Sequence, residues 1–270
     1  MSMTAKRAVF SALHRQGCFV IPNPWDVGSA RALASLGFKA LATTSSGFAW
    51  SHGKPDGAMP VDAVLDHLKA MAAATALPLN ADFENGHADT AEGVAAQFSR
   101  ACGTGISGIS IEDASKDPRQ PLYDIDAAVA RVRAARAAID AAGGDVILTG
   151  RAEGLFMANS DLGDVIARLK AYGEAGADCL YAPGLKTAEQ VVAVVKAAAP
   201  KPVNVLVTAP GFSVAQLAAL GVRRVSLGGA LARTAWGEFM RAAGEIAGHG
   251  TFERLGHAAS GRDMNALMDD

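Results

Sequence analysis

The sequence predicts a (β/α)8 barrel that forms one domain over residues 1–270. Two observations favour this fold class. Eight short segments are continuously apolar instead of alternating, which is typical of parallel strands buried on both faces. Segments with helical periodicity lie between them, and several end in a glycine directly before the next apolar segment. A doubly wound open sheet is the alternative, but eight units without a second domain favour the barrel.

The elements follow one another in a regular order. A glycine such as Gly176 or Gly221 ends a helix, and a strand starts one or two residues later. Strands are expected at Cys18–Pro22, Ala40–Thr44, Leu77–Ala81, Gly108–Ile111, Val146–Thr149, Asp178–Tyr181, Val203–Val207 and Arg224–Leu227. Helices are expected at Ala63–Ala74, Ile125–Ala141, Leu162–Ala175, Thr187–Ala199, Val214–Leu220 and Ala230–Ile246. The polar residues 248–270 are expected to form a short C-terminal tail or one further helix.

The composition argues against several classes of partner and location. The formal net charge is −2 and there is no basic cluster, so nucleic acid and anionic membrane are not expected as partners. No apolar run reaches the ~20 residues that span a bilayer, and the N-terminus shows no secretion signal. Cys18, Cys102 and Cys179 are far apart and are expected to be reduced thiols. The chain is therefore predicted to be cytoplasmic.

Charged residues recur where the apolar strands end, at the edge of a barrel that carries the chemistry. They are Asp56, Asp82, Glu84, Glu112, Arg151 and Glu153. Asp82 and Glu84 are two positions apart, so both project to the same side of an extended chain. Like charges so close repel unless a cation or a proton lies between them. Pairing with a nearby lysine or arginine is the alternative interpretation.

Two further segments have the composition of binding motifs. Residues 43–47, Thr-Thr-Ser-Ser-Gly, follow the second strand, and their hydroxyls and backbone N–H groups either hold an anion or cap an ordinary turn. Residues 103–108 match the dinucleotide pattern G-x-G-x-x-G, but they follow a helix and precede a strand, so they are predicted to be a loop. No nucleotide P-loop, serine nucleophile elbow or zinc-protease motif is present.

Five motifs occur in order along the chain at the predicted strand ends. They are Pro-Asn-Pro-Trp-Asp at residues 22–26, Gly-Lys-Pro-Asp at 53–56, Ala-Asp-Phe-Glu-Asn-Gly at 81–86, Ile-Glu-Asp at 111–113 and Gly-Arg-Ala-Glu at 150–153. Together they resemble the isocitrate lyase / phosphoenolpyruvate mutase superfamily, from about Pro22 to Arg233. The resemblance implies a (β/α)8 barrel, a Mg²⁺ ion, a small carboxylate substrate and 2-oxo-acid or enolate chemistry. It also implies a homo-oligomer, either a dimer of helix-swapped barrels or a tetramer.

The resemblance also implies roles for individual residues. Asp82 and Glu84 would hold Mg²⁺, with Mn²⁺ as an alternative ion, and Asp56 and Glu112 would support them. The substrate carboxylate would be bound by Thr44, Ser45, Ser46 and Arg151. Arg151, Glu112 and Lys116 would form the catalytic group.

The chain departs from the superfamily at the position of the acid/base residue. Its lyases carry a Lys-Lys-Cys-Gly-His loop after strand four, whereas residues 112–120 here contain no cysteine. Strand six ends in Tyr181, where mutases have histidine and lyases glutamate. The loop Ala114–Leu122 is predicted to be a lid that orders over the substrate. The acid/base group is one of Lys116, Asp117, Arg119, His52 and His87.

Three functions are compatible with these residues. The first is a Mg²⁺-dependent carbon–carbon lyase or decarboxylase that acts on a small 2-oxo- or 2-hydroxy-dicarboxylate through a metal-stabilised enolate and releases pyruvate or a similar oxo acid. The second is a phosphoenolpyruvate/phosphonopyruvate phosphomutase or hydrolase. The third is a non-catalytic oxo-acid-binding barrel. The absent cysteine disfavours isocitrate and methylisocitrate cleavage by the usual route.

Overall fold

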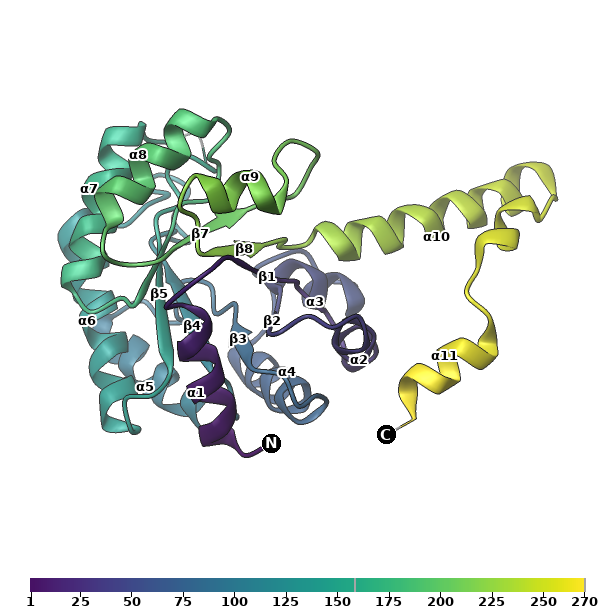
Figure 1. Ribbon diagram of the computed structural model, residues 1–270, viewed down its shortest axis with the longest axis horizontal. Coiled ribbons are helices and arrows are strands. Elements are labelled where there is room, and N and C mark those ends of the chain that lie inside the picture. The colour runs from purple at the N-terminus through teal and green to yellow at the C-terminus, as the bar shows by residue number, and fades with distance from the viewer. Residues whose placement is uncertain (158, 270) are drawn as a thin grey trace.

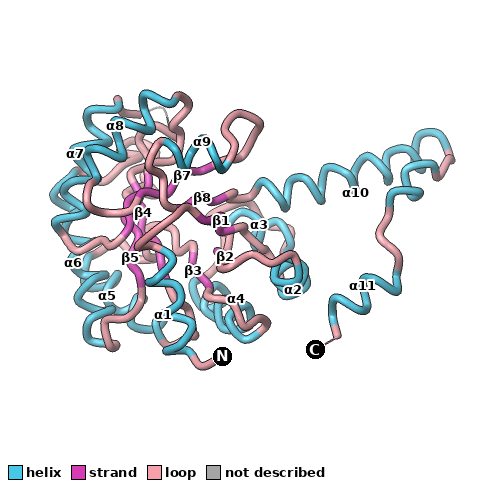
Figure 2. Tube along the Cα trace, in the orientation of Figure 1, coloured by secondary structure: helices cyan, strands magenta, loops and turns pink. Residues whose placement is uncertain are grey.

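A computed structural model describes residues 1–157 and 159–269. Eight parallel strands form one sheet in the order β1-β8-β7-β6-β5-β4-β3-β2, enclosed by helices (Figures 1 and 2). The two ends of this sheet meet where the Ala42 N–H donates to the Pro22 carbonyl at 3.0 Å and the Asn23 side chain donates to the Thr43 carbonyl at 2.8 Å. The predicted (β/α)8 barrel is therefore confirmed.

All eight strands lie within or next to the predicted apolar segments. They are β1 (Phe19–Ile21), β2 (Leu41–Ala42), β3 (Leu79–Ala81), β4 (Gly108–Glu112), β5 (Ile147–Arg151), β6 (Cys179–Tyr181), β7 (Val203–Leu206) and β8 (Arg224–Ser226). β4 and β5 run further than predicted, to Glu112 and Arg151, and these two residues are partners in the parallel register. Two residues expected just past the strands are therefore their last members, side by side.

Helices separate the strands and form the outer layer (Figure 2). They are α1 (Met3–Leu13), α2 (Val27–Ser35), α3 (Ser45–Ser51), α4 (Val61–Ala73), α5 (Ala91–Cys102), α6 (Ile125–Ala141), α7 (Leu162–Glu174), α8 (Ala188–Ala198), α9 (Val214–Ala219), α10 (Ala230–His249), the 3₁₀ helix η1 (Glu253–His257) and α11 (Gly261–Met268). The six helices predicted from periodicity are present. The short α3 was not predicted because its 7 residues make fewer than two helical turns, too few to show a clear periodicity, although Thr44 caps it.

Helix α1 covers the amino ends of the strands. Phe10 is fully buried and packs against Gly108. A Cβ atom at position 108 would come within 2.5 Å of Phe10 Cε1, so only glycine fits there. The Lys6 ammonium donates to the Ala72 carbonyl at 2.7 Å, and the Arg7 guanidinium donates to the Ile106 carbonyl at 2.9 Å. These bonds satisfy carbonyls of the segments that lead into β3 and β4, so the barrel is closed at this end.

The C-terminal elements extend away from the barrel. Helix α10 projects outward, and η1 and α11 turn back toward α2 (Figure 1). Gly250 ends α10 in the left-handed conformation, at φ 66°. Arg31 in α2 donates to the Met268 carbonyl in α11. In the part of the chain that the structure describes, no helix is both long and apolar enough to cross a membrane.

The interior of the barrel is polar, and the apolar core lies between the strands and the helices. Fully buried side chains such as Phe83, Val94 and Phe98 fill that outer space. Inside, where (β/α)8 barrels usually stack branched apolar side chains, the strands place buried polar residues. They include Asn80, Ser110, Thr149, Asn204, Arg224 and Ser226. This polar lining opens the barrel toward its carboxyl end.

Candidate active site

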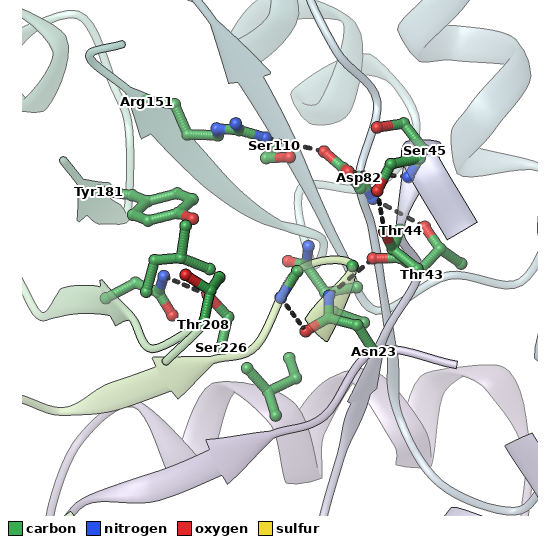
Figure 3. Close-up of a pocket in the computed structure, with 18 of the residues that line it drawn as sticks. Asn23, Thr43, Thr44, Ser45, Asp82, Ser110, Arg151, Tyr181, Thr208 and Ser226 are labelled. Atoms are coloured by element: carbon green, nitrogen blue, oxygen red, sulfur yellow. Dashed lines mark hydrogen bonds and ion pairs between the residues drawn. The ribbon is translucent and has the colours of Figure 1, made fainter. Parts of the chain in front are cut away.

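A cavity of about 410 Å³ extends from the carboxyl ends of the strands into the barrel (Figure 3). This volume lies within the ~300–1,000 Å³ range of small-molecule sites. Trp50, Phe156 and Arg233 form its rim, all in segments that follow strands. Asn80 and Arg224 lie on the strands themselves and form its floor. The cavity therefore opens at the carboxyl ends of the strands and reaches deeper into the barrel than those ends.

The polar run after β2 forms one wall of the cavity. The Thr43 hydroxyl accepts a hydrogen bond from the Asp82 N–H at 2.9 Å, and the Ser45 N–H donates to Asp82 Oδ2 at 3.0 Å. The Thr44 and Ser46 hydroxyl oxygens lie 3.0 Å apart. All three residues predicted to bind the substrate carboxylate here, Thr44, Ser45 and Ser46, line the cavity. This wall also fixes the orientation of the Asp82 carboxylate.

Arg151 connects three carboxylates at the end of β5. Its Nη1 lies 2.9 Å from Asp82 Oδ1 and 3.1 Å from Glu112 Oε2, and its Nε lies 2.8 Å from Glu153 Oε1. The guanidinium also lies over the Tyr181 ring, 5.0 Å from its centroid (Figure 3). The parallel register brings Glu112 beside Arg151, and the next strand brings Tyr181. Of the two residues for which pairing with a nearby lysine or arginine was the alternative interpretation, Asp82 therefore pairs with Arg151, whereas the ion pair of Glu84 is with His87.

One arginine does not balance the three acids around it. Burial disfavours its charge, yet Glu112, Glu153 and Asp82 raise the pKa of Arg151 well above its usual value. Burial raises the pKa of both Glu112 and Glu153, and the charge of Arg151 only partly opposes this. The carboxyl end of the cavity therefore holds an excess of acidic over basic groups.

Glu84 and Asp56 add to this excess. Burial, and then the charges of Asp82 and Asp56, raise the pKa of Glu84 to about 7. Burial also raises the pKa of Asp56. Among the described residues, Glu84 forms its ion pair with His87, whose Nε2 lies 3.8 Å from Glu84 Oε1. Three carboxylates from two loops, Asp82 and Glu84 after β3 and Asp56 after α3, thus influence one another, and among them only Asp82 pairs with an arginine, Arg151.

The backbone that carries Glu84 is held in an unfavourable conformation. Glu84 and His87 have φ angles of 47° and 49°, in the left-handed region that ordinary residues rarely adopt. Arg131 from α6 secures this segment by donating to the Asn85 and Ala88 carbonyls at 2.5 and 2.7 Å. Strain of this kind concentrates at functional sites because the surrounding structure must compensate for it.

The four predicted metal ligands do not surround one point. Within residues 1–157 and 159–269, no three His, Cys, Asp or Glu side chains come together as a metal site. Asp82 and Asp56 line the cavity, Glu84 lines a small adjoining space, and Arg151 separates Glu112 from it. Mg²⁺ usually takes one or two protein carboxylates and keeps several waters. The oxygen donors and surplus negative charge therefore fit an ion bound by Asp82, with Asp56 and Glu84 acting through water.

None of the predicted acid/base candidates lines the cavity. Lys116 and Arg119 are exposed, Asp117 pairs with Arg119 at 3.0 Å, and His52 caps the end of α3. His87 packs edge-on against Phe83, and burial lowers its pKa to about 4. The charge of Lys116 acts on both Glu84 and His87, so its loop lies on the acidic side of the site. The bridge between Ala114 and Leu122 closes that loop into a hairpin.

Several cavity residues were not predicted from the sequence. In the sequence Tyr181 stands out only as a departure from the superfamily, but its buried ring forms part of the wall. Asn204, Arg224 and Ser226 lie on strands that were recognised for their apolar neighbours. The available signal was a set of polar residues inside otherwise apolar segments. With no assigned register, the sequence did not show which of them point inward.

Comparisons with known proteins agree with this architecture. The family model for phosphoenolpyruvate phosphomutase matches residues 10–247. An uncharacterized protein from Mycobacterium tuberculosis H37Rv is 35% identical over 81% of each chain. An oxaloacetate decarboxylase from Paraburkholderia xenovorans LB400 is 27% identical over 71% of this chain and 65% of that one.

Solved structures show the same fold over nearly the whole chain. A protein from Burkholderia cenocepacia J2315 named as a lyase/mutase is 47% identical, with a TM-score of 0.96 over 99% of this chain and 97% of that chain. A phosphonopyruvate hydrolase in complex with oxalate and Mg²⁺ is 25% identical, with a TM-score of 0.84 over 99% of this chain and 95% of that chain.

Proposed function

The chain belongs to the phosphoenolpyruvate mutase / isocitrate lyase superfamily, and on that premise we propose that it is a Mg²⁺-dependent lyase or decarboxylase. Its substrate is a small 2-oxo- or 2-hydroxy-dicarboxylate, and it releases pyruvate or a similar oxo acid. Relatives named as oxaloacetate decarboxylases support this reaction class.

One observation carries the proposal. Asp82 and Arg151, a cation-binding and an anion-binding group, lie 2.9 Å apart on the wall of a polar cavity of about 410 Å³. A metal-bound oxo acid presents a positive ion and a carboxylate at similar spacing. The phosphonopyruvate hydrolase complex with oxalate and Mg²⁺ supports this pairing of ligands.

Asp82 is the residue best placed to hold Mg²⁺, with Asp56 and Glu84 binding its waters. When bound, the ion supplies stabilisation of the negative charge that develops on the substrate oxygen. Ser45 and Arg151 each occupy one oxygen of Asp82, so the carboxylate is oriented before any ligand arrives.

The remaining residues bind and orient the substrate. Arg151 pairs with the substrate carboxylate, and the Thr44 and Ser46 hydroxyls donate to it from the opposite wall. Because Glu112 and Glu153 hold the guanidinium, it does not reorganise during the reaction. Trp50 and Phe156 at the rim exclude water once the substrate is bound.

The proton that the product carbon receives has two sources in this proposal. Burial raises the pKa of Tyr181, so its hydroxyl stays protonated in the cavity wall at neutral pH. Lys116 is the second source, because its loop approaches the acidic side of the site and could close over it. Tyr181→Phe and Lys116→Met distinguish them, since only the true donor slows protonation while leaving oxalate binding unchanged.

A phosphonopyruvate hydrolase or phosphoenolpyruvate phosphomutase is the second candidate function. The matching family model and the hydrolase structure favour it. Both chemistries need an anion site beside a cation site, so the cavity accommodates either substrate class. Phosphate release from phosphonopyruvate, or conversion of phosphoenolpyruvate, without pyruvate release from dicarboxylates would favour this alternative.

We also propose that the protein is a homo-oligomer, a dimer or a tetramer. On the outward-projecting α10, Trp236, Phe239 and Met240 are 38%, 62% and 60% exposed. Apolar patches of this kind are typical of protein–protein contacts. Light scattering is expected to give a mass of at least two chains, and Phe239→Glu is expected to lower it. A monomer at all concentrations would contradict this proposal.

The function is tested by incubating the protein with Mg²⁺ and a panel of 2-oxo- and 2-hydroxy-dicarboxylates while pyruvate is measured. Pyruvate release above the Mg²⁺ buffer blank, abolished by EDTA, supports the proposal, and isocitrate is expected to give little or no glyoxylate. Oxalate binding without turnover of any panel member would leave a non-catalytic oxo-acid-binding barrel. Robust glyoxylate release from isocitrate would show that another residue replaces the missing cysteine.

A further inference from the structure

A second arginine lies at the floor of the same cavity. Arg224 is the first residue of β8, is 3% exposed and lines the cavity from inside the barrel. It lies two residues before Ser226, about 7 Å further from the mouth at the usual rise of a strand. The Asn204 side chain links the two, since it accepts from Arg224 Nε at 2.9 Å and donates to the Ser226 hydroxyl at 2.8 Å.

The partners of this guanidinium are all neutral. Nη2 donates to the Thr149 hydroxyl at 3.1 Å, and Nη1 lies 3.3 Å from His14 Nε2 and 3.5 Å from Asn80 Oδ1. Burial and the charge of Arg224 lower the pKa of His14 to about 3, so the imidazole stays neutral. Among the described residues, no carboxylate forms an ion pair with Arg224.

Other buried arginines of the barrel are satisfied differently. Arg7 pairs with Asp145, Arg168 with Asp113, and Arg151 with three carboxylates. No carboxylate among the described residues forms an ion pair with Arg131, but three backbone carbonyls accept from it and it borders a space of only about 10 Å³. Arg224 alone in this group combines an uncompensated buried charge with a ligand-sized cavity. Burying a charge without a counter-charge is costly, so an anion entering the cavity would be bound strongly.

We propose that Arg224 binds the distal carboxylate of the substrate, while the other end of the molecule lies at Asp82 and Arg151. This inference rests on the proposed function and narrows its substrate class. The ligand is a linear dicarboxylate that spans the cavity from the strand ends to the floor. A short oxo acid fills only the upper part, and a monocarboxylate of the same length leaves Arg224 without a counter-charge.

The position of this charge also selects the reaction. Decarboxylation of the distal group would remove the negative charge that Arg224 binds. Arg224 would then stabilise the bound substrate more than the transition state, which would slow that reaction. Cleavage between C2 and C3 of a 2-hydroxy-dicarboxylate retains that group. The hydroxyl loses its proton and becomes the oxo group, the electron pair of the broken bond moves to C3 and into the distal carboxylate, and C3 then takes up a proton. The products are a 2-oxo acid and a saturated monocarboxylic acid, with no net oxidation.

Arg224 stabilises this cleavage because charge on the distal group increases as the bond breaks. The substrate class is therefore a 2-hydroxy-dicarboxylate that is split into two carboxylic acids. With a methyl group on C2, as in 2-methylmalate, the oxo acid is pyruvate and the second product is acetate.

Binding measurements separate the distal site from the proposed function. In Mg²⁺ the wild type is expected to bind malate at least tenfold more tightly than 2-hydroxybutyrate, which lacks the distal carboxylate. Arg224→Gln removes that preference and leaves the oxalate affinity unchanged. The matched control is Arg223→Gln, because the Arg223 side chain lies outside the barrel and donates to the Gly17 carbonyl at 2.7 Å. The control keeps the preference.

The results that would contradict the distal site differ from those that would contradict the proposed function. A malate preference that persists in Arg224→Gln, or is absent in the wild type while oxalate still binds, would overturn the distal site. Failure of the wild type to bind oxalate in Mg²⁺ would instead overturn the proposed function. If Arg224→Gln does not fold, Arg224→Lys retains a charge and is expected to keep a reduced malate preference; an unchanged or absent preference in that folded variant would count against the site.

With turnover, 2-methylmalate should yield equal amounts of pyruvate and acetate, and Arg224→Gln should slow this reaction more than any oxaloacetate decarboxylation.

Discussion

Arg151 and Arg224 face the same cavity and meet opposite electrostatic surroundings. Arg151 at the mouth is shared by Asp82, Glu112 and Glu153, whereas the partners of Arg224 within the described part of the chain are neutral: Asn204, Thr149, Asn80 and His14. The mouth therefore has surplus negative charge and the floor surplus positive charge. A cation with a dicarboxylate compensates both ends at once.

This difference shows why the charge of a buried residue must be judged with its neighbours. An arginine already paired with carboxylates orients a ligand but attracts it weakly, because much of its charge is compensated. An arginine surrounded by neutral groups attracts an anion strongly. When no anion is bound, its buried charge is stable only because hydrogen bonds satisfy its N–H groups. Substitutions at the mouth and at the floor of the cavity separate these two situations.

The substitution with the largest expected effect on activity and stability is that of Arg151, at the mouth of the cavity. Arg151→Met should lower the rate of pyruvate release at least ~100-fold, on the order of 3 kcal/mol of transition-state stabilisation. It should also lower the free energy of unfolding by about 3–5 kcal/mol, because it leaves buried carboxylates unpaired. Steady-state kinetics and urea unfolding measure the two effects. The exposed Arg119, which pairs only with Asp117, supplies the control variant Arg119→Met, and equal losses in both variants would refute the role of Arg151.

The next effect is a pH dependence at the floor. The pKa of His14 is about 3 in the folded protein against 6.5 for an ordinary histidine, so between these values the unfolded chain binds a proton that the folded protein does not. Stability therefore falls as pH decreases below 6.5, by up to ~1.4 kcal/mol per pH unit from this group. His14→Gln should flatten that decline in urea unfolding at pH 7, 6 and 5. Parallel curves for variant and wild type would show that burial and the charge of Arg224 do not lower the pKa of His14 in the folded protein.

The sequence predicted the mouth of the cavity much better than its floor. Continuous apolar segments and glycine stops located all eight strands, and the fold then placed Asp82, Glu112 and Arg151 at one edge. Those residues were recognisable because charges at strand ends have few structural reasons to be there. The sequence did not show that Arg151 would lie between Asp82 and Glu112, because that depends on the register of β4 with β5.

The floor was missed for a different reason. Arg224 opens a segment that was recognised as a strand from its apolar residues, and its inward direction depends on the tilt and register of β8. The same limit applies to Asn80, Thr149 and Asn204, which come from three other strands and meet only inside the barrel. Local patterns do not encode such contacts.

A smaller effect on stability is expected when the floor arginine is removed. Arg224→Gln should change the free energy of unfolding by less than ~1.5 kcal/mol, because the loss of a few hydrogen bonds is offset by removal of an uncompensated buried charge. Urea unfolding of this variant beside Arg151→Met compares the two arginines directly. A loss as large as that of Arg151→Met would mean that Arg224 is mainly structural.

The smallest effect concerns the loop Ala114–Leu122. Lys116 on this loop is exposed and its charge already acts on Glu84, so closure of the loop would add positive charge at the mouth and not at the floor. Limited proteolysis in this loop should slow when oxalate and Mg²⁺ are present, and Lys116→Met should reduce the protection. Equal cleavage rates with and without the ligand would count against a lid.

The metal site at Asp82 is tested most directly by calorimetric titration with oxalate in Mg²⁺ and in EDTA, for wild type and Asp82→Asn. Asparagine keeps the size of the side chain and removes the charge, and circular dichroism confirms that the variant is folded. Oxalate is expected to bind the wild type only in Mg²⁺ and to bind Asp82→Asn in neither condition. Equal oxalate affinity in EDTA, or in the folded Asp82→Asn variant, would contradict a metal-dependent oxo-acid site in this cavity.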